Sequence, residues 1–279
     1  MRTIVSPQKP KSLARRIHLE FTKIYLFVGL GILLQSCVEI RQTEETAKPE
    51  IAGATDFARK RKSTPVLMVG DSLTVGGFGE ALQAYLLQRF GSNNVAVYAS
   101  CGSSPEHWMR SGPKFITKCG YREQTPYTTV LYDFQNGRRP QHALTPKLED
   151  LIEKYHPETV IVQLGTNWMD GFAADSRSEL NYGQILDHFV AAIRSEPKTV
   201  SKIIWITPPD SSRYSKTVEM RVKNLIMAAA ERHSFQIIDS SRMTHYVPGR
   251  SGGDGVHYNS AAAKEWANRV TRQLDGMLQ

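Results

Sequence analysis

The sequence lacks the features that mark nucleic-acid-binding and metal-dependent proteins. No cluster of Lys and Arg interleaved with aromatic residues stands out in the body of the chain, so we expect no nucleic-acid partner. The net charge of +8 reflects mainly residues 1–36, which hold six basic residues and one acidic residue and leave 29 basic and 26 acidic residues to the remainder. Most histidines show no paired spacing typical of a metal site, so we expect no metal and no cofactor. These histidines are His107, His142, His156, His188, His233 and His245.

Internal repeats and low-complexity tracts are absent too, and the apolar run near the start, residues 24–34, is short. Eleven residues rise only about 16 Å as a helix, which is too little for the ~30 Å hydrocarbon layer of a membrane. A basic stretch ending at Lys23 precedes the run, and together they predict an export signal. The alternative is an N-terminal membrane anchor or a buried helix.

The residues after this run, Leu34-Gln35-Ser36-Cys37, resemble the lipobox of bacterial lipoproteins. The resemblance implies cleavage before Cys37 and lipidation of that residue. We therefore expect a signal peptide over 1–36, a lipidated cysteine with a flexible polar tether over 37–62, and one catalytic domain over 63–279. Such a protein would be lipid-anchored in the cell envelope, on the periplasmic side of a bacterial membrane.

Cysteine is scarce, with three residues in the chain. With Cys37 assigned to the anchor, Cys101 and Cys119 remain as a possible pair in an oxidising compartment. A disulfide between them would close a loop of about 18 residues and stabilise the fold by roughly 3 kcal/mol. The alternative is two reduced, buried thiols.

Apolar runs and helical patterns alternate along the body of the chain. This predicts an α/β fold with a parallel sheet of about five strands and helices on both faces. The expected strands are 65–69, 95–99, 159–164, 202–206 and 235–238, and the expected helices are 73–90, 146–155, 182–194, 218–233 and 261–278. Segment 105–145 shows no clear pattern apart from a possible strand at 128–134. A loop of that length is usually functional or has structure of its own.

Ser72 is the first candidate for chemistry because the chain turns there from a strand into a helix. The carboxyl ends of parallel strands are where open α/β sheets bind ligands. A serine at the start of a helix also lies near backbone N–H groups that stabilise a developing negative charge. Ser72 is therefore a candidate nucleophile.

Gly102, Asn167 and the pair Asp254 and His257 follow other strands, and we expect them to converge on Ser72. A serine hydroxyl needs an adjacent base to attack an ester, and His257 can supply it. Asp254 can orient the imidazole, while Asp210 and Asp239, which follow the fourth and fifth strands, are alternative partners for it. The N–H groups of Ser72 and Gly102 and the amide of Asn167 can stabilise the oxyanion.

These motifs, in this order, resemble the four sequence blocks of the SGNH/GDSL hydrolase family. The blocks are Gly70-Asp71-Ser72-Leu73, Gly102, Gly165-Thr166-Asn167 and Asp254-Gly255-Val256-His257. The resemblance implies a flavodoxin-like α/β/α sandwich that hydrolyses esters or thioesters without a metal. It assigns Ser72 as nucleophile, His257 as base and Asp254 as its partner. The family often has Asp after the Asn of the third block, where this chain has Trp168.

The functional hypothesis is a cell-envelope serine esterase that removes ester groups, O-acetyl above all, from a carbohydrate or cell-wall polymer. Aromatic and Arg side chains in segment 105–145, such as Trp108 and Arg110, together with Trp168, would contact sugar rings and carboxylates. The alternative for these aromatics is simple packing. A lipase, lysophospholipase or thioesterase of the same family and a non-catalytic glycan-binding lipoprotein are the other functional hypotheses. Residues 76–79 superficially resemble a phosphate-binding glycine loop, but their spacing does not fit.

Overall fold

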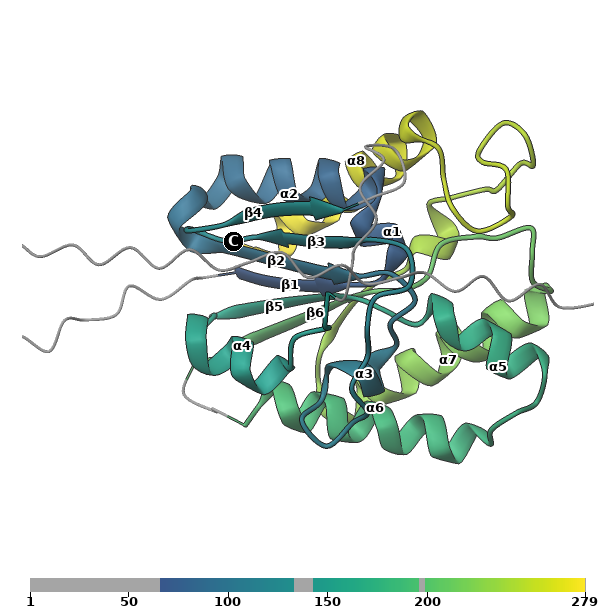
Figure 1. Ribbon diagram of the computed structural model, residues 1–279. Coiled ribbons are helices and arrows are strands. Elements are labelled where there is room, and N and C mark those ends of the chain that lie inside the picture. Colours follow the sequence, from purple (N-terminus) through teal and green to yellow (C-terminus); the bar gives the residue numbers. More distant parts are fainter. Residues whose placement is uncertain (1–65, 133–142, 196–198, 279) are drawn as a thin grey trace, which may run out of the picture. The chain divides into compact units, whose positions relative to one another are not determined.

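The computed structural model describes residues 66–132, 143–195 and 199–278. These residues contain the strands β1 (Val66–Gly70), β2 (Val95–Ser100), β3 (Tyr121–Gln124), β4 (Thr129–Tyr132), β5 (Thr159–Gln163), β6 (Lys202–Ile206) and β7 (Gln236–Ile238). All seven join in one sheet in the order β4-β3-β2-β1-β5-β6-β7. β1 lies at the centre and pairs in parallel with β2 and β5. The carboxyl ends of five parallel strands therefore meet at one edge (Figure 1).

The helices form a layer on each face of the sheet, as Figure 1 shows. They are α1 (Ser72–Val75), α2 (Gly77–Phe90), α3 (Pro105–Trp108), α4 (Leu148–Tyr155), α5 (Met169–Ala173), α6 (Glu179–Ile193), α7 (Lys216–His233) and α8 (Ser260–Met277). α2 and α8 pack on one face, and α4, α6 and α7 pack on the other. The predicted three-layer α/β/α sandwich is confirmed.

The five expected parallel strands are present, and β3 and β4 add an antiparallel hairpin beyond β2. Both strands lie in segment 105–145, where we expected one strand near 128–134. β3 reads Tyr-Arg-Glu-Gln, which has neither the apolar run nor the alternation typical of a strand. Arg122 is nevertheless buried, since its guanidinium donates to the backbone oxygens of Thr74 and Val75. A buried arginine satisfied by backbone oxygens gives no apolar signal in the sequence.

Both faces of β1, β2 and β5 are buried, which explains why these strands read as continuous apolar runs. On one face Phe78 of α2 stacks on Trp266 of α8, with ring centroids 3.5 Å apart. On the other, Trp205 of β6 packs against Phe189 of α6. These two layers hold the central strands, and hence the edge where the parallel strands end, in a fixed position.

The helix expected at 73–90 is interrupted at Gly76, whose extended backbone separates α1 from α2. The glycines around this break have a packing role. A Cβ at Gly79 would lie 1.7 Å from the backbone oxygen of Thr74, so only glycine allows α2 to pass this close. The glycines here therefore allow the close turn between the two helices.

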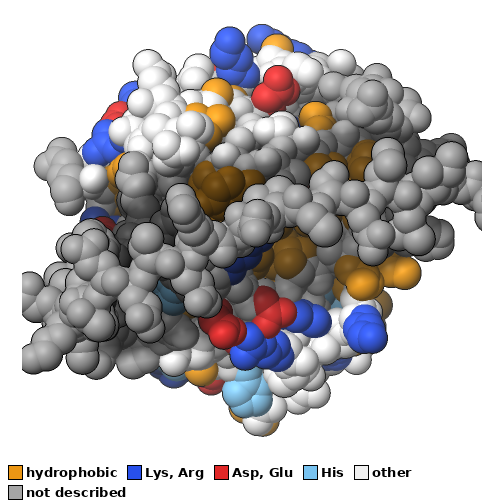
Figure 2. Space-filling model, turned by 60° about the vertical axis from the view of Figure 1, so that its left-hand side comes forward, with side chains coloured by type: hydrophobic (Ala, Val, Ile, Leu, Met, Phe, Trp, Pro, Cys, Tyr) orange, Lys and Arg blue, Asp and Glu red, His pale blue; other side chains and the backbone are white. Residues whose placement is uncertain are grey.

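The predicted signal peptide with all its charges, Cys37 and the tether lie outside the described residues. None of the helices within the described ranges combines the length and apolar character needed to cross a membrane. On the surface shown in Figure 2, acidic side chains lie beside basic ones among the described residues.

Candidate active site

The turn between β1 and α1 fixes the position of Ser72. Asp71 caps α1, with its Oδ1 accepting a hydrogen bond from the Leu73 N–H at 3.0 Å. A Cβ at Gly70 would lie 2.1 Å from Thr74 Oγ1, so the turn requires glycine there. Ser72 is thereby presented at the carboxyl edge of the central strand.

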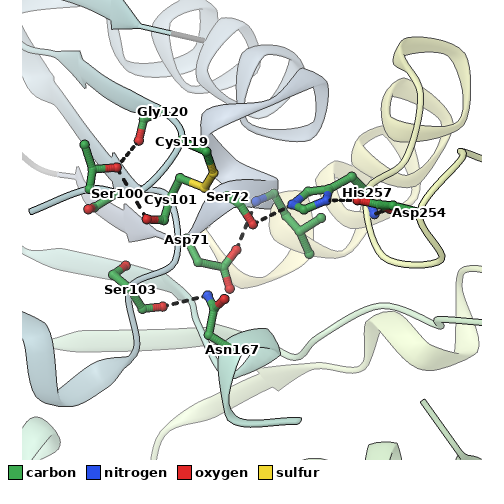
Figure 3. Close-up of a disulfide and its surroundings, with 12 residues drawn as sticks. Asp71, Ser72, Ser100, Cys101, Ser103, Cys119, Gly120, Asn167, Asp254 and His257 are labelled. Carbon is green, nitrogen blue, oxygen red and sulfur yellow. Dashed lines mark hydrogen bonds and ion pairs between the residues drawn. A yellow bond between two sulfur atoms is a disulfide. The ribbon is translucent and has the colours of Figure 1, made fainter. Parts of the chain in front are cut away.

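The loop between β7 and α8 brings His257 and Asp254 to this turn. His257 Nε2 lies 2.8 Å from Ser72 Oγ, and His257 Nδ1 lies 2.5 Å from Asp254 Oδ2 (Figure 3). The second carboxylate oxygen, Oδ1, accepts the backbone N–H groups of Val256 and His257 at 2.9 and 2.8 Å. The three side chains expected to act together therefore form one hydrogen-bonded chain.

The electrostatics of Asp254 suit its place in this chain. Partial burial acts to raise the pKa of its carboxyl, but the hydrogen bonds from His257 and Val256 outweigh burial and lower the pKa to about 2. The carboxylate is therefore ionised at neutral pH and accepts the Nδ1–H of His257. That arrangement leaves Nε2 free to accept the Ser72 hydroxyl proton.

The two alternative carboxylates have other partners. Asp210 is paired with Lys216 and accepts the backbone N–H of Tyr246 at 2.6 Å. Asp239 accepts from Ser241 and pairs with Arg242 at 3.2 Å. Of the three candidate aspartates, Asp254 is the one that contacts His257.

The two remaining candidates for oxyanion stabilisation lie on neighbouring turns. Gly102 has a φ of +82°, which favours glycine, and the next residue, Ser103, accepts a hydrogen bond from Asn167 Nδ2 at 2.8 Å. Figure 3 shows Asn167 directed at the Ser103 carbonyl. One hydrogen of this amide is thus used to join the two turns, and the other is available to a substrate oxygen.

Glu106 is a residue of this region that the sequence did not single out. Its carboxylate accepts the Trp168 indole N–H at 2.9 Å and pairs with Arg177 at 2.9 Å. Glu106 thereby connects α3, which follows the Gly102 loop, to the turn that carries Asn167. No sequence pattern links these positions, because 62 residues separate Glu106 from Trp168.

Asp71 is a second residue whose setting the sequence did not reveal. Its side chain is fully buried, and this burial raises the pKa of the carboxyl to about 6, although the hydrogen bond from Leu73 opposes the change. Within the described ranges, Asp71 Oδ2 has no hydrogen-bond partner, and the same holds for Gln163 Nε2 and Thr166 Oγ1. An imperfectly satisfied polar cluster therefore underlies the Ser72 turn.

The structure contradicts the expectation that Trp108 and Trp168 contact a substrate. Trp108 and Trp168 are buried in the core, where their indole N–H groups donate to Ser103 and Glu106. Tyr127 is exposed, but it lies in the turn between β3 and β4, at the opposite edge of the sheet from Ser72. Trp108 and Trp168 pack inside the protein, which was the alternative for these aromatics.

Arg110, which we expected to be available to a substrate carboxylate, is engaged within the protein. It pairs with Asp150 at 2.5 Å and Glu153 at 2.8 Å on α4. Residues 133–142 of the same segment, with Arg138 and Arg139, lie outside the described residues. Arg110 is therefore not free to bind a substrate carboxylate.

Cys101 and Cys119 form a disulfide that lies beside Ser72 (Figure 3). It joins the end of β2 to the segment before β3, with the two Cα atoms 5.4 Å apart. A cavity of about 330 Å³ opens between this disulfide, Ser72 and His257. Among the residues described, no group of three or more His, Cys, Asp or Glu is arranged to hold a metal ion.

A lipase/acylhydrolase profile matches this chain and defines it as an ester-bond hydrolase. The chain belongs to the GDSL-like lipase/acylhydrolase family, whose profile matches residues 66–270. Family membership confirms the resemblance drawn from the four sequence blocks. It also argues against the hypothesis of a non-catalytic glycan-binding protein.

Relatives of this chain are distant. A multidomain esterase from Ruminococcus flavefaciens is 24% identical over 238 residues, an alignment that covers 77% of this chain and 29% of that protein. Protein BcsX from Komagataeibacter xylinus is 23% identical over 216 residues, covering 74% of this chain and 75% of BcsX. A solved structure of a peptidoglycan O-acetylesterase superimposes with a TM-score of 0.50 at 12% identity, covering 78% of this chain and 92% of the other. This last likeness shows a shared fold.

Proposed function

We propose that the protein is a serine esterase in which Ser72 is the nucleophile, His257 the general base and Asp254 the residue that orients His257. The observation that carries this proposal is the hydrogen-bonded chain from Asp254 through His257 to Ser72, with distances of 2.5 and 2.8 Å. Nucleophile, base and orienting carboxylate in this arrangement meet the geometric requirement of acyl transfer through a covalent intermediate.

In the proposed mechanism, Ser72 Oγ attacks the ester carbonyl carbon while His257 Nε2 takes the hydroxyl proton. The bond from carbon to the alcohol oxygen then breaks, and His257 returns the proton to that oxygen. Asp254, ionised at neutral pH, stabilises the protonated imidazole between these two transfers. Water next attacks the acyl-enzyme with His257 again as base, and the acid leaves as Ser72 regains its proton.

The oxyanion of each tetrahedral intermediate would be stabilised by the N–H groups of Ser72 and Gly102 and by the amide of Asn167. The hydrogen bond between Asn167 and Ser103 supports this assignment, because it holds the amide against the loop that contains Gly102. Donors fixed in this way need no reorganisation when the negative charge develops.

We propose O-acyl groups on a carbohydrate or cell-wall polymer, O-acetyl groups among them, as the substrate. The main support is the predicted export signal and lipidated Cys37, which would place the enzyme in the cell envelope beside such polymers. The names of two compared proteins, a multidomain esterase and a peptidoglycan O-acetylesterase, agree with this class of reaction. A lipase or thioesterase acting on longer chains is the second candidate, favoured by the apolar lining of the cavity beside Ser72.

The test measures acetate released from acetylated cell wall and acetylated xylan by fragment 38–279 and by its Ser72→Ala variant. We expect release by the parent and a loss of about 10³-fold or more in the variant. Unchanged release in Ser72→Ala would contradict the proposed nucleophile.

A separate experiment tests the lipid anchor. In a bacterial host, labelled palmitate should be incorporated into the chain of residues 1–279 and not into its Cys37→Ser variant. Labelling of both would contradict lipidation at Cys37.

A further inference from the structure

The cavity beside Ser72 has walls from three separate parts of the chain. Val75 and Phe78 lie where α1 meets α2, Ser260 and Ala263 lie on the first turn of α8, and the Cys101–Cys119 disulfide supplies the third part. Ser72 and His257 also line it. A group bonded to an ester carbon at Ser72 can therefore extend directly into this space.

The lining suits a hydrocarbon group. Most of it is apolar, and the phenolic hydroxyl of Tyr258, one of its few polar groups, already donates to the backbone oxygen of Asp210 at 2.6 Å. A sugar placed there would lose hydrogen bonds to water without replacing them, at a cost in free energy for each hydroxyl. In an acylated carbohydrate, the apolar part of the ester is the acyl chain.

The volume gives the size of that chain. About 330 Å³ is near the lower end of the range for small-molecule pockets, and it is more than a two-carbon acetyl group fills. Both cysteines of the disulfide line this space, so the disulfide takes up room that a longer chain would need.

The disulfide side of the cavity is held firmly by the backbone. The Cys101 N–H donates to the Gly120 oxygen at 2.9 Å, and the Lys118 N–H donates to the Cys101 oxygen at 3.0 Å. A Cβ at Gly120 would lie 2.7 Å from Val75 Cγ1, so this wall lies directly against α1. Cys101 itself is almost fully buried.

We propose that this cavity receives the acyl chain of the substrate and that the Cys101–Cys119 disulfide limits its length, so that short hydrocarbon acyl groups longer than acetyl are accepted. The proposal rests on the proposed function, since it assumes that the acyl group is transferred to Ser72. It makes the disulfide a specificity-determining element in addition to a covalent cross-link.

The first experiment measures kcat/KM for p-nitrophenyl acetate, butanoate, hexanoate and octanoate with the parent enzyme and Ser260→Trp. Ser260 is exposed and lines the cavity, so the indole fills the cavity without disturbing the core. We expect butanoate or hexanoate to be the best substrate of the parent. In Ser260→Trp, its kcat/KM should fall at least ten-fold relative to that for acetate. Ala261→Trp, one residue along the same exposed turn and outside the cavity lining, is the matched control and should retain the parent profile.

The second experiment removes the two sulfur atoms in the double variant Cys101→Ala/Cys119→Ala. We expect the ratio of octanoate to butanoate kcat/KM to rise several-fold in protein that remains folded by circular dichroism. A chain-length profile unchanged in both Ser260→Trp and the double cysteine variant would overturn the cavity proposal, as would an equal loss at every chain length in Ser260→Trp. Hydrolysis that persists in Ser72→Ala would instead overturn the proposed function, so the two failures are distinguishable.

Discussion

The indole N–H of Trp168 donates to a carboxylate oxygen of Glu106 at 2.9 Å, which joins the two turns on either side of the proposed oxyanion site. The adjacent Asn167 bonds the Ser103 oxygen at 2.8 Å, and Ser103 in turn accepts the Trp108 indole N–H at 3.0 Å. Trp168 and Asn167 thus fix the loop after β2 against the turn after β5, and Trp108 holds Ser103 within that loop. The aromatic residues of this region act on the position of the donors and not on the substrate surface.

Replacing Glu106 by alanine should disturb this arrangement. The variant leaves the buried Trp168 N–H without an acceptor, at a cost of about 1–3 kcal/mol, and frees the turn that carries Asn167. We expect kcat for a short p-nitrophenyl ester to fall by about 10- to 100-fold with little change in KM. Glu106→Gln keeps an acceptor oxygen and should recover most of kcat.

The matched control for Glu106 is Arg177→Ala, which removes the exposed ion pair and keeps the bond between Glu106 and Trp168. Its kcat should stay close to that of the parent, since an exposed pair contributes little. Equal losses in Glu106→Ala and Glu106→Gln would show that the Trp168 bond has no part in positioning.

Asn167→Ala tests the proposed oxyanion donor directly. Loss of one preorganised donor should lower kcat by about 10²–10³-fold and leave KM nearly unchanged, because the interaction forms chiefly in the transition state. Steady-state kinetics with a p-nitrophenyl ester, together with circular dichroism, would check this. A variant that is folded and as active as the parent would remove Asn167 from the proposed mechanism.

The raised pKa of Asp71 predicts that the stability of the protein depends on pH. The pKa of this carboxyl rises from its ordinary value of 3.8 to about 6 in the folded protein, so between these values the folded protein keeps a proton that the unfolded chain releases. The free energy of unfolding should therefore fall by roughly 3 kcal/mol as the pH rises from 4 to above 6. Asp71→Asn keeps the acceptor for the Leu73 N–H and should lack this fall.

Urea unfolding of the parent and Asp71→Asn from pH 4 to pH 8 measures this difference. The pair should match most closely near pH 4, where the folded parent is neutral at position 71, and this point serves as the internal control. Parallel curves over the whole range would contradict the raised pKa of Asp71.

The disulfide should contribute about 3 kcal/mol to stability, because it closes a loop with a sequence separation of 18 residues. Reduction with dithiothreitol should lower the free energy of unfolding of the parent by about this amount. The double variant Cys101→Ala/Cys119→Ala is the control, since it should start at the lower value and not respond to the reductant. An equal response in both proteins would assign the effect to something other than this bond.

Most of the sheet could be predicted from the sequence, because β1, β2, β5 and β6 are largely buried on both faces and read as apolar runs. The hairpin of β3 and β4 was only partly predictable. Arg122 lies on β3 as a buried polar residue, and its backbone partners on α1 are 47 and 48 residues away in the chain. Local pattern cannot show a polar strand whose burial depends on such distant contacts.

The candidate site was predictable where its residues follow strands, since parallel topology brings strand ends together. This is how Ser72, Asn167 and His257 could be selected. Glu106 and the buried state of Asp71 could not, because each depends on which side chains meet across the fold. The prediction that Trp108 and Trp168 face a substrate was wrong for the same reason. The sequence around an aromatic residue outside the regular pattern does not show whether it faces solvent or the core.

His257 is three residues from the start of α8, and α8 packs along α2 on one face of the sheet. The imidazole therefore reaches Ser72 only after this last helix has docked. During refolding from denaturant, the return of esterase activity would report the docking of the carboxyl-terminal helix, whereas secondary structure recovered by the earlier strands and helices would be spectroscopically visible yet inactive.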